Sequence, residues 1–252
     1  MTALENFCSA ACGRAPSDNR SNDPNCYVLI DHAGAPGLLV ELRRSPAIHW
    51  WSLFDESKEQ SALDVAPILA KLPHARPRSS ADEFLRWVHR TCEFSTSVIV
   101  LHSNWTPGVL AAALKRRFDV VLPDHVPVML RYFDTRVLES LLCVLAEPQR
   151  DEFMGVASRW YWLDRAGQLQ TRPSRELQAD PWPQRFELDV EQQNALIDAG
   201  HADALVERMN AQAPDLCQGT PRAELHSLAT LCLAKLDKLH IEDARTDRKS
   251  VV

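Results

Sequence analysis

Two groups of polar side chains in this sequence have residue types that can do acid–base or nucleophilic chemistry. The first consists of Arg131, Asp134 and Arg136, which follow one another closely at the end of an apolar run. Polar residues at the end of a strand often bind ligands in open α/β sheets. An arginine–carboxylate pair is also the usual way to bury a guanidinium, and we favour this structural interpretation over catalysis. Breaking such a buried pair would cost roughly 3 kcal/mol.

The second group could assemble a Ser–His–Asp hydrolase. His102 and Ser103 follow an apolar segment, and Asp124 and His125 precede the next one. A nucleophilic serine of this class usually sits on a strained, glycine-flanked turn, which Ser103 lacks. A small hydrolase that uses Ser103 or the Arg131/Asp134 turn therefore stays an alternative.

Motifs for bound cofactors and metals are missing from the chain. It contains no G-x-G-x-x-G, Walker A, H-E-x-x-H or G-x-S-x-G pattern. The nine histidines are scattered without the convergent spacing that metal ligands need. The sequence therefore predicts a protein that is not an enzyme and that has no cofactor and no metal.

A strand followed by a helix must position the arginine–aspartate cluster. Residues 126–132 are almost continuously apolar, which predicts a buried central strand. Asp134 stands where a helix N-cap belongs. Leucines then recur at helical spacing, at Leu138, Leu141, Leu142 and Leu145.

The same alternation of strand and helix extends from residue 26 to residue 145. It predicts an α/β (α+β) fold, whose N-terminal α/β lobe holds a mixed, substantially parallel sheet. The predicted order is a flexible tail (1–25), the α/β lobe (26–172), a small helical C-terminal lobe (184–240) and a second flexible tail (241–252). The two long helices of the C-terminal lobe cannot bury their apolar faces alone, so they must pack on the first lobe or on a partner.

Aromatic and leucine side chains are the candidate partner-binding residues. Neighbouring aromatic residues on a strand face opposite sides, so each of the two clusters, at residues 50–51 and 160–162, either fills the core or offers an anchor to a partner. We place a docking cleft between the lobes, with the tryptophans of residues 160–162 on one side and the leucine stripe of residues 225–239 on the other. The candidates are Trp50, Trp51, Arg131, Asp134, Arg136, Trp160, Trp162, Leu228 and Leu236.

Bulk composition excludes several function classes. The net charge of −6 and the pI of about 5.8 argue against a nucleic-acid surface. No run of residues is long and apolar enough for a membrane span, and the first residues do not resemble a signal peptide. Seven cysteines without a C-x-x-C pattern are typical of reduced thiols. We therefore expect a cytoplasmic protein that contacts neither nucleic acid nor membrane.

Several short motifs, in the same order, resemble the Tap/TEC effector chaperones of bacterial type VI secretion. The sequence RYFDTRVL, at residues 131–138, resembles the family's arginine–aromatic–aromatic–aspartate–proline–arginine signature, with Thr135 in place of the proline. The opening strand YVLID ends at Asp31 and is followed by His32, where the family has a small residue. Matching blocks also occur at residues 52–54, 63–72 and 98–105, so the resemblance spans about residues 27–162.

This resemblance implies a non-enzymatic chaperone or adaptor. Such proteins bind a toxin effector in the cytosol, by its N-terminal or PAAR-like region, and help to load it onto the VgrG spike. A structural scaffold of the secretion machine is a further alternative.

Overall fold

The computed structural model describes residues 24–73, 80–92 and 96–238. The predicted tails at 1–25 and 241–252 lie outside these residues, apart from Pro24 and Asn25. The division into lobes at residues 172 and 184 stays a prediction.

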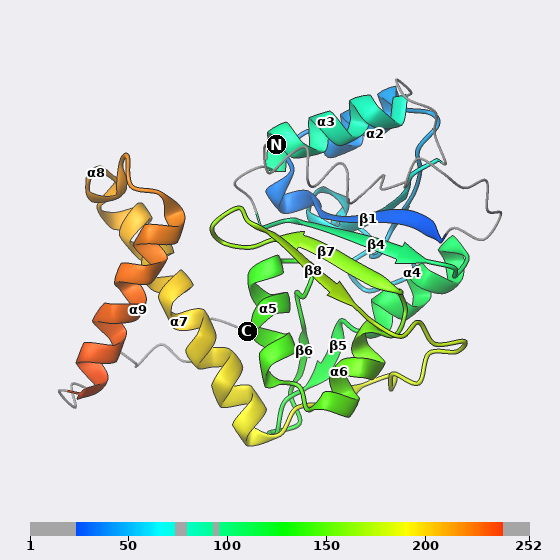
Figure 1. The fold of residues 1–252 in the computed structure, drawn as a ribbon. Coiled ribbons are helices and arrows are strands. Elements are labelled where there is room, and N and C mark those ends of the chain that lie inside the picture. Colours follow the sequence, from blue (N-terminus) through cyan, green and yellow to red (C-terminus); the bar gives the residue numbers. More distant parts are fainter. Residues whose placement is uncertain (1–23, 74–79, 93–95, 239–252) are drawn as a thin grey trace.

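A six-stranded sheet forms the centre of the molecule (Figure 1). Its order is β2-β3-β1-β4-β7-β8, and every neighbouring pair is antiparallel. The strands are β1 (Asn25–Asp31), β2 (His49–Ser52), β3 (Pro67–Lys71), β4 (Val98–Ser103), β7 (Arg159–Leu163) and β8 (Leu169–Pro173). The predicted substantially parallel sheet is therefore wrong.

The helical connections explain the error. The pairings make β1 and β2 run in the same direction, as a helical crossover requires, but β3 inserts between them with the opposite direction. In the same way, β3 and β4 run in the same direction, and β1 lies between them. An alternation of strands and helices does not say which strands become neighbours.

Helices cover both faces of this sheet (Figure 1). On one side lie α2 (Leu38–Arg44) and α3 (Ser80–Cys92), and on the other lie α4 (Pro107–Arg116), α5 (Thr135–Val144) and α6 (Glu147–Met154). Because both faces are covered, consecutive residues of β1 from Tyr27 to Ile30 are all fully buried. Short 3-10 helices follow β1 at His32–Gly34 and precede β3 at Leu63–Val65.

A second, smaller sheet has the order β6-β5-β9. It consists of β5 (Asp119–Val121), β6 (Pro127–Met129) and β9 (Phe186–Glu187). The β5–β6 pair is an antiparallel hairpin, and β9 joins β5 in parallel. The predicted buried central strand at 126–132 is thus wrong: only three of its residues are in a strand, and Val126 is 46% exposed.

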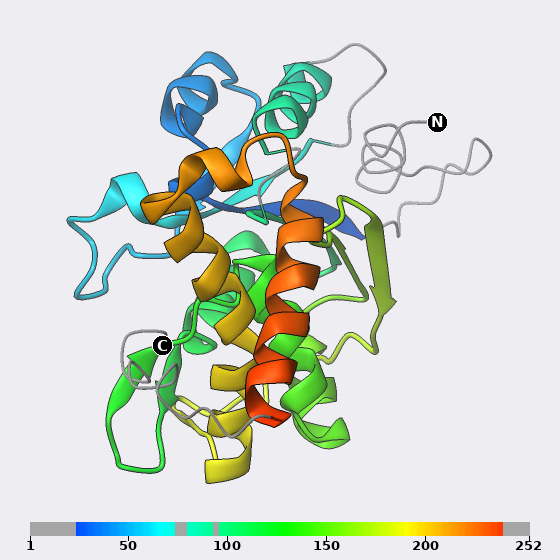
Figure 2. The same cartoon turned by 90° about the vertical axis from the view of Figure 1, so that its left-hand side faces the viewer.

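The C-terminal helices form a hairpin beside this core (Figures 1 and 2). It contains α7 (Val190–Gln212), the short α8 (Pro214–Cys217) and α9 (Arg222–Lys238). Asp189 caps α7 through a capping box with Gln192. The hairpin has its own small core, made of Ala202, Val206, Cys217, Leu225 and Ala229. Its contact with the rest of the molecule runs mainly through α7 and α5.

Candidate functional site

A groove of about 420 Å³ lies between the small sheet, α5 and α7, and we call it the α7 groove. One face of the β5–β6 hairpin supplies its floor, because alternate residues of a strand point to the same side. On α7, small residues at Ala199, Gly200 and Ala204 keep one wall low. The larger apolar residues that line it are Val120, Leu122, Val128, Met129, Leu130, Val137, Leu188, Leu196 and Ile197. The groove can therefore take up an apolar segment.

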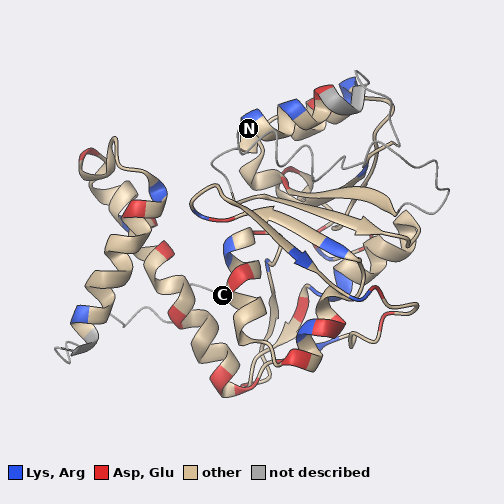
Figure 3. Ribbon diagram, in the orientation of Figure 1, with Lys and Arg blue, Asp and Glu red and all other residues tan. Residues whose placement is uncertain are grey.

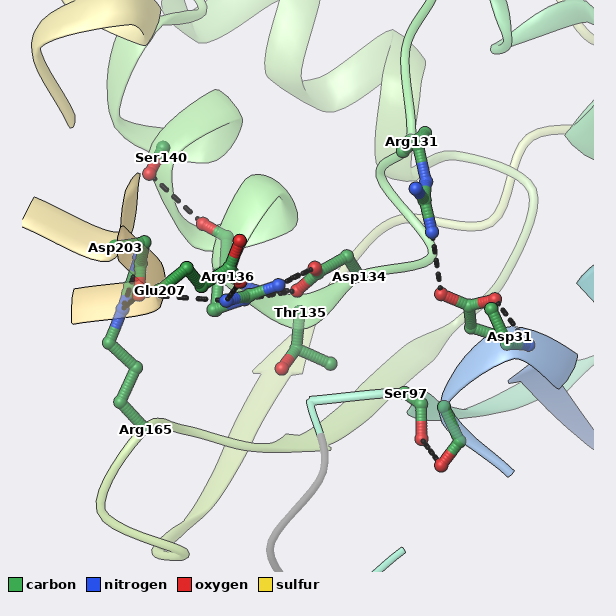
Figure 4. Close-up of polar contacts among 12 residues, drawn as sticks. Asp31, Ser97, Arg131, Asp134, Thr135, Arg136, Ser140, Arg165, Asp203 and Glu207 are labelled. Atoms are coloured by element: carbon green, nitrogen blue, oxygen red, sulfur yellow. Dashed lines mark hydrogen bonds and ion pairs between the residues drawn. The ribbon is translucent and has the colours of Figure 1, made fainter. Parts of the chain in front are cut away.

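Two arginines, one on α5 and one in the β7–β8 turn, join α7 to the rest of the molecule at the rim of this groove (Figure 4). Arg136, on α5, binds Asp134 at 2.6 Å and reaches Glu207 of α7 at 3.1 Å. Arg165, in the β7–β8 turn, binds Asp203 of α7 at 2.7 Å. We call this set of residues the ion-pair clamp; it also includes Glu139, which binds Arg165 at 3.0 Å.

Asp134 has two roles in the clamp. Its carboxylate caps α5 by accepting a hydrogen bond from the backbone N–H of Arg136, as predicted from the sequence. The same carboxylate accepts hydrogen bonds from the Arg136 guanidinium. Burial would raise the pKa of Asp134, but the hydrogen bonds and the charge of Arg136 outweigh burial and hold that pKa below its usual value.

Acid should therefore weaken the clamp. A carboxyl whose pKa is lower in the folded state contributes stability that is complete above its unfolded pKa, about 4, and is lost as the pH falls through the folded pKa. We expect Asp134→Asn to be less stable than the wild type at pH 7, with a difference that shrinks below about pH 4. Thermal unfolding from pH 7 to pH 2 measures it. Glu207→Gln, at a 58% exposed side chain, is the control with little effect. A pH-independent difference for Asp134→Asn would contradict this account.

Arg131 lies at the end of the groove and pairs with a carboxylate, as expected, but it is exposed where burial was expected. Its side chain is 55% exposed, and its partner is Asp31 at the end of β1, at 3.1 Å. The guanidinium also lies over the ring of Phe133, 5.5 Å from its centroid. Burial raises the pKa of Asp31 despite the charge of Arg131. Because the arginine of this pair is more than half exposed, we expect its removal to cost less than the roughly 3 kcal/mol of a fully buried pair.

A second cavity, of about 760 Å³, flanks the other side of the α5–α7 contact. Cys143 and Val144 of α5 line it opposite Gln192 and Ala195 of α7. The contact between α5 and α7 therefore has a cavity on each side, and the ion pairs of the clamp cross that contact.

The family comparison covers the half of the chain that carries β1 to α6. The family model described as "Domain of unknown function (DUF4123)" matches residues 26–152. The chain belongs to the DUF4123 family. No curated protein and no solved structure matches it. In this DUF4123 chain the floor of the α7 groove and α5 lie inside the matched region, whereas the α7 wall lies beyond it.

In this DUF4123 protein the two tryptophans of the predicted aromatic cleft are buried. Trp160 is fully buried and donates its indole N–H to the carbonyl of Met154. Trp162 is 6% exposed and donates to Glu139. Both tryptophans lie on β7, inside a sheet covered on both faces, and they therefore belong to the core.

The other candidates lie apart from the groove. Trp50 and Trp51 are half-buried on β2, at one edge of the large sheet. On α9, Leu228 is exposed and Leu236 is half-buried, and neither residue lines the groove. Of the predicted residues, the structure brings only Arg131, Asp134 and Arg136 together at the α7 groove.

Ser103 lies in the core and its hydroxyl is hydrogen-bonded there. It is fully buried, and its hydroxyl lies 2.7 Å from both the carbonyl oxygen of Val156 and the carboxylate of Glu176. Glu176 also accepts hydrogen bonds from Asn104, so this set ties the segment after β8 to the end of β4. The serine hydroxyl is thus occupied and closed to a substrate.

The ranges 24–73, 80–92 and 96–238 contain no candidate metal site and no candidate membrane span. No group of three or more His, Cys, Asp or Glu residues there is arranged to hold a metal ion. No helix in those ranges is both long and apolar enough to cross a bilayer.

Sequence reasoning missed a buried arginine. Arg117 follows α4 and is fully buried, and it binds Asp180 with two parallel hydrogen bonds of 3.0 Å. Its guanidinium lies 5.5 Å from the ring centroids of Phe153 and Trp182. These contacts between Arg117 and Asp180 fix the segment between β8 and α7. The Pro-rich composition around Asp180 gave no sign of it, because the partners are 63 residues apart.

Proposed function

We propose that this DUF4123 protein is a type VI secretion adaptor that binds a toxin effector in the α7 groove. The observation that carries the proposal is the apolar groove, whose α7 wall is joined to α5 and to the β7–β8 turn by ion pairs. An effector segment that would otherwise expose apolar side chains gains stability by burying them there. The resemblance to Tap/TEC chaperones and the DUF4123 match support the same conclusion.

The groove's chemistry favours a peptide segment over nucleic acid. Its interior is apolar, α7 carries mostly acidic charge, and α5 carries both signs (Figure 3). Nucleic-acid surfaces instead need clustered basic residues. The occupant we propose is the N-terminal or PAAR-like region of the effector, and the adaptor passes this complex to the VgrG spike in the cytoplasm. The buried Ser103 favours this non-enzymatic role over a hydrolase.

Co-expression tests the proposal. The probe is the toxin encoded beside a VgrG gene in the source genome, tagged and expressed with and without this chain. We expect the chain to co-purify with the toxin and to raise its soluble yield, because apolar surface is covered in the complex. A toxin that is equally soluble alone and that never retains the chain would contradict an adaptor role.

A further inference from the structure

The outer side of α9 carries an apolar stripe that nothing covers in the described part of the chain. Leu228 is 56% exposed and Leu231 is 61% exposed. The adjacent face of the helix carries Leu225 and Ala229, which pack on α7. Figures 1 and 2 show α9 as the outermost element of the molecule, with α7 between it and the first lobe. Exposed leucines in neighbouring helical turns indicate an interaction surface.

Charged residues extend this stripe at both ends. Glu224 lies one helical turn before Leu228, and Lys235 lies one turn after Leu231. At 100° per residue, the four side chains fall within about 60° of arc on the helix. Both charged residues are exposed, and neither makes an ion pair with any residue that the structure describes.

The arrangement of the four residues is self-complementary. The midpoint between Ala229 and Thr230 lies halfway between the two leucines, and it also lies halfway between Glu224 and Lys235. In an antiparallel pair of α9 helices with a twofold axis through this midpoint, Leu228 of one copy meets Leu231 of the other. Each Glu224 then meets a Lys235, so opposite charges face each other twice.

We infer that a second copy of this chain covers the stripe and forms a twofold-symmetric, antiparallel α9–α9 dimer. An isologous interface of this kind requires the same patch to complement itself, which the order acidic, apolar, apolar, basic does. A parallel pairing would place like charges together. Because no α9 residue lines the α7 groove, the dimer leaves both grooves open to clients.

Charge reversal tests the symmetry directly. Either Glu224→Lys or Lys235→Glu alone puts like charges opposite each other twice, and we expect each variant to weaken the dimer at least about tenfold in Kd. The double variant restores both pairs and should dimerise like the wild type. Mixing the two single variants should also restore dimers, because every contact in the mixed dimer is then attractive. Sedimentation velocity over micromolar to submillimolar concentrations measures these states.

A second variant checks the apolar part. Leu228→Asp should disrupt the dimer and leave a folded monomer, because Leu228 is already more than half exposed. The control is Val109→Asp on α4, at a 55% exposed position, which should leave the dimer intact. A wild-type chain that stays monomeric throughout, or single charge variants that dimerise as well as the wild type, would overturn the inference.

Discussion

Arg117→Ala is expected to lower the free energy of unfolding by about 4 kcal/mol, because it removes the buried partner of a buried carboxylate and leaves that carboxylate with the partly exposed Arg116. All five N–H donors of this guanidinium are used. Each terminal nitrogen donates one hydrogen bond to Asp180 and one to a backbone carbonyl, that of Ala113 or of Glu152. The Nε–H group donates to the carbonyl of Phe153. The side chain of Asp180 is only 3% exposed, so water cannot replace the lost bonds. Urea unfolding measures the change.

Arg116 offers a matched control for this prediction. It binds the same carboxylate at 2.6 Å, but its side chain is 35% exposed. Arg116→Ala should therefore cost about 1 kcal/mol or less. Arg117→Lys should remain clearly destabilised, because an ammonium group cannot reproduce the two parallel bonds. Equal losses for Arg116→Ala and Arg117→Ala would show that burial of the guanidinium does not govern the stability of these contacts.

Ile197→Glu is expected to weaken effector binding at least about 100-fold, roughly 2.7 kcal/mol, because it places a carboxylate in the apolar α7 groove. Ile197 is half-buried in the free protein, so the variant should still fold. Titration of the purified effector segment into each variant, followed by calorimetry, gives the affinities. Ile197→Val, which keeps the wall apolar, should bind nearly as well as the wild type.

A control away from the groove makes the result specific. Val109→Glu adds the same charge on α4 at an exposed position that does not line the groove. It should bind the effector like the wild type. If Ile197→Glu bound the effector as tightly as Val109→Glu does, the groove would not be the docking site.

Signals within a few residues predicted the local structure well. Asp134 caps α5 as expected. Such a cap depends on a hydrogen bond between residues two positions apart, which the sequence displays directly. The cap of α7 at Asp189 and the β7–β8 turn at Asp164–Gly167 are features of the same local kind.

Long-range pairing could not be predicted from the same signals. Nothing in a single strand says that β3 inserts between β1 and β2, so a parallel sheet was expected. The pairs Arg117–Asp180 and Arg136–Glu207 join residues 63 and 71 positions apart, and each residue alone has the pattern of an ordinary surface charge. For Trp160 and Trp162 the sequence allowed two interpretations, a place in the core or an anchor for a partner. The burial of both side chains in the covered sheet assigns them to the core.

The small sheet shows the same limit in the candidate site. Residues 126–132 are apolar enough for a central strand, but the turn before them makes a hairpin with β5 instead. The apolar side chains that seemed to need burial on two faces in fact line the floor of the α7 groove, as Val128 and Leu130 do. An excess of apolar residues was therefore visible in the sequence, and its use as a binding surface was not.

Site-specific photo-cross-linking in the co-expressed complex tests the docking of an effector in the α7 groove most directly. A photoreactive amino acid is placed at Ile197, inside the groove, and in a separate variant at Trp51, on the edge strand β2 of the large sheet. The account predicts an adduct between this chain and the effector from position 197 and none from position 51. An effector that co-purifies with both variants but cross-links only from position 51 would contradict it.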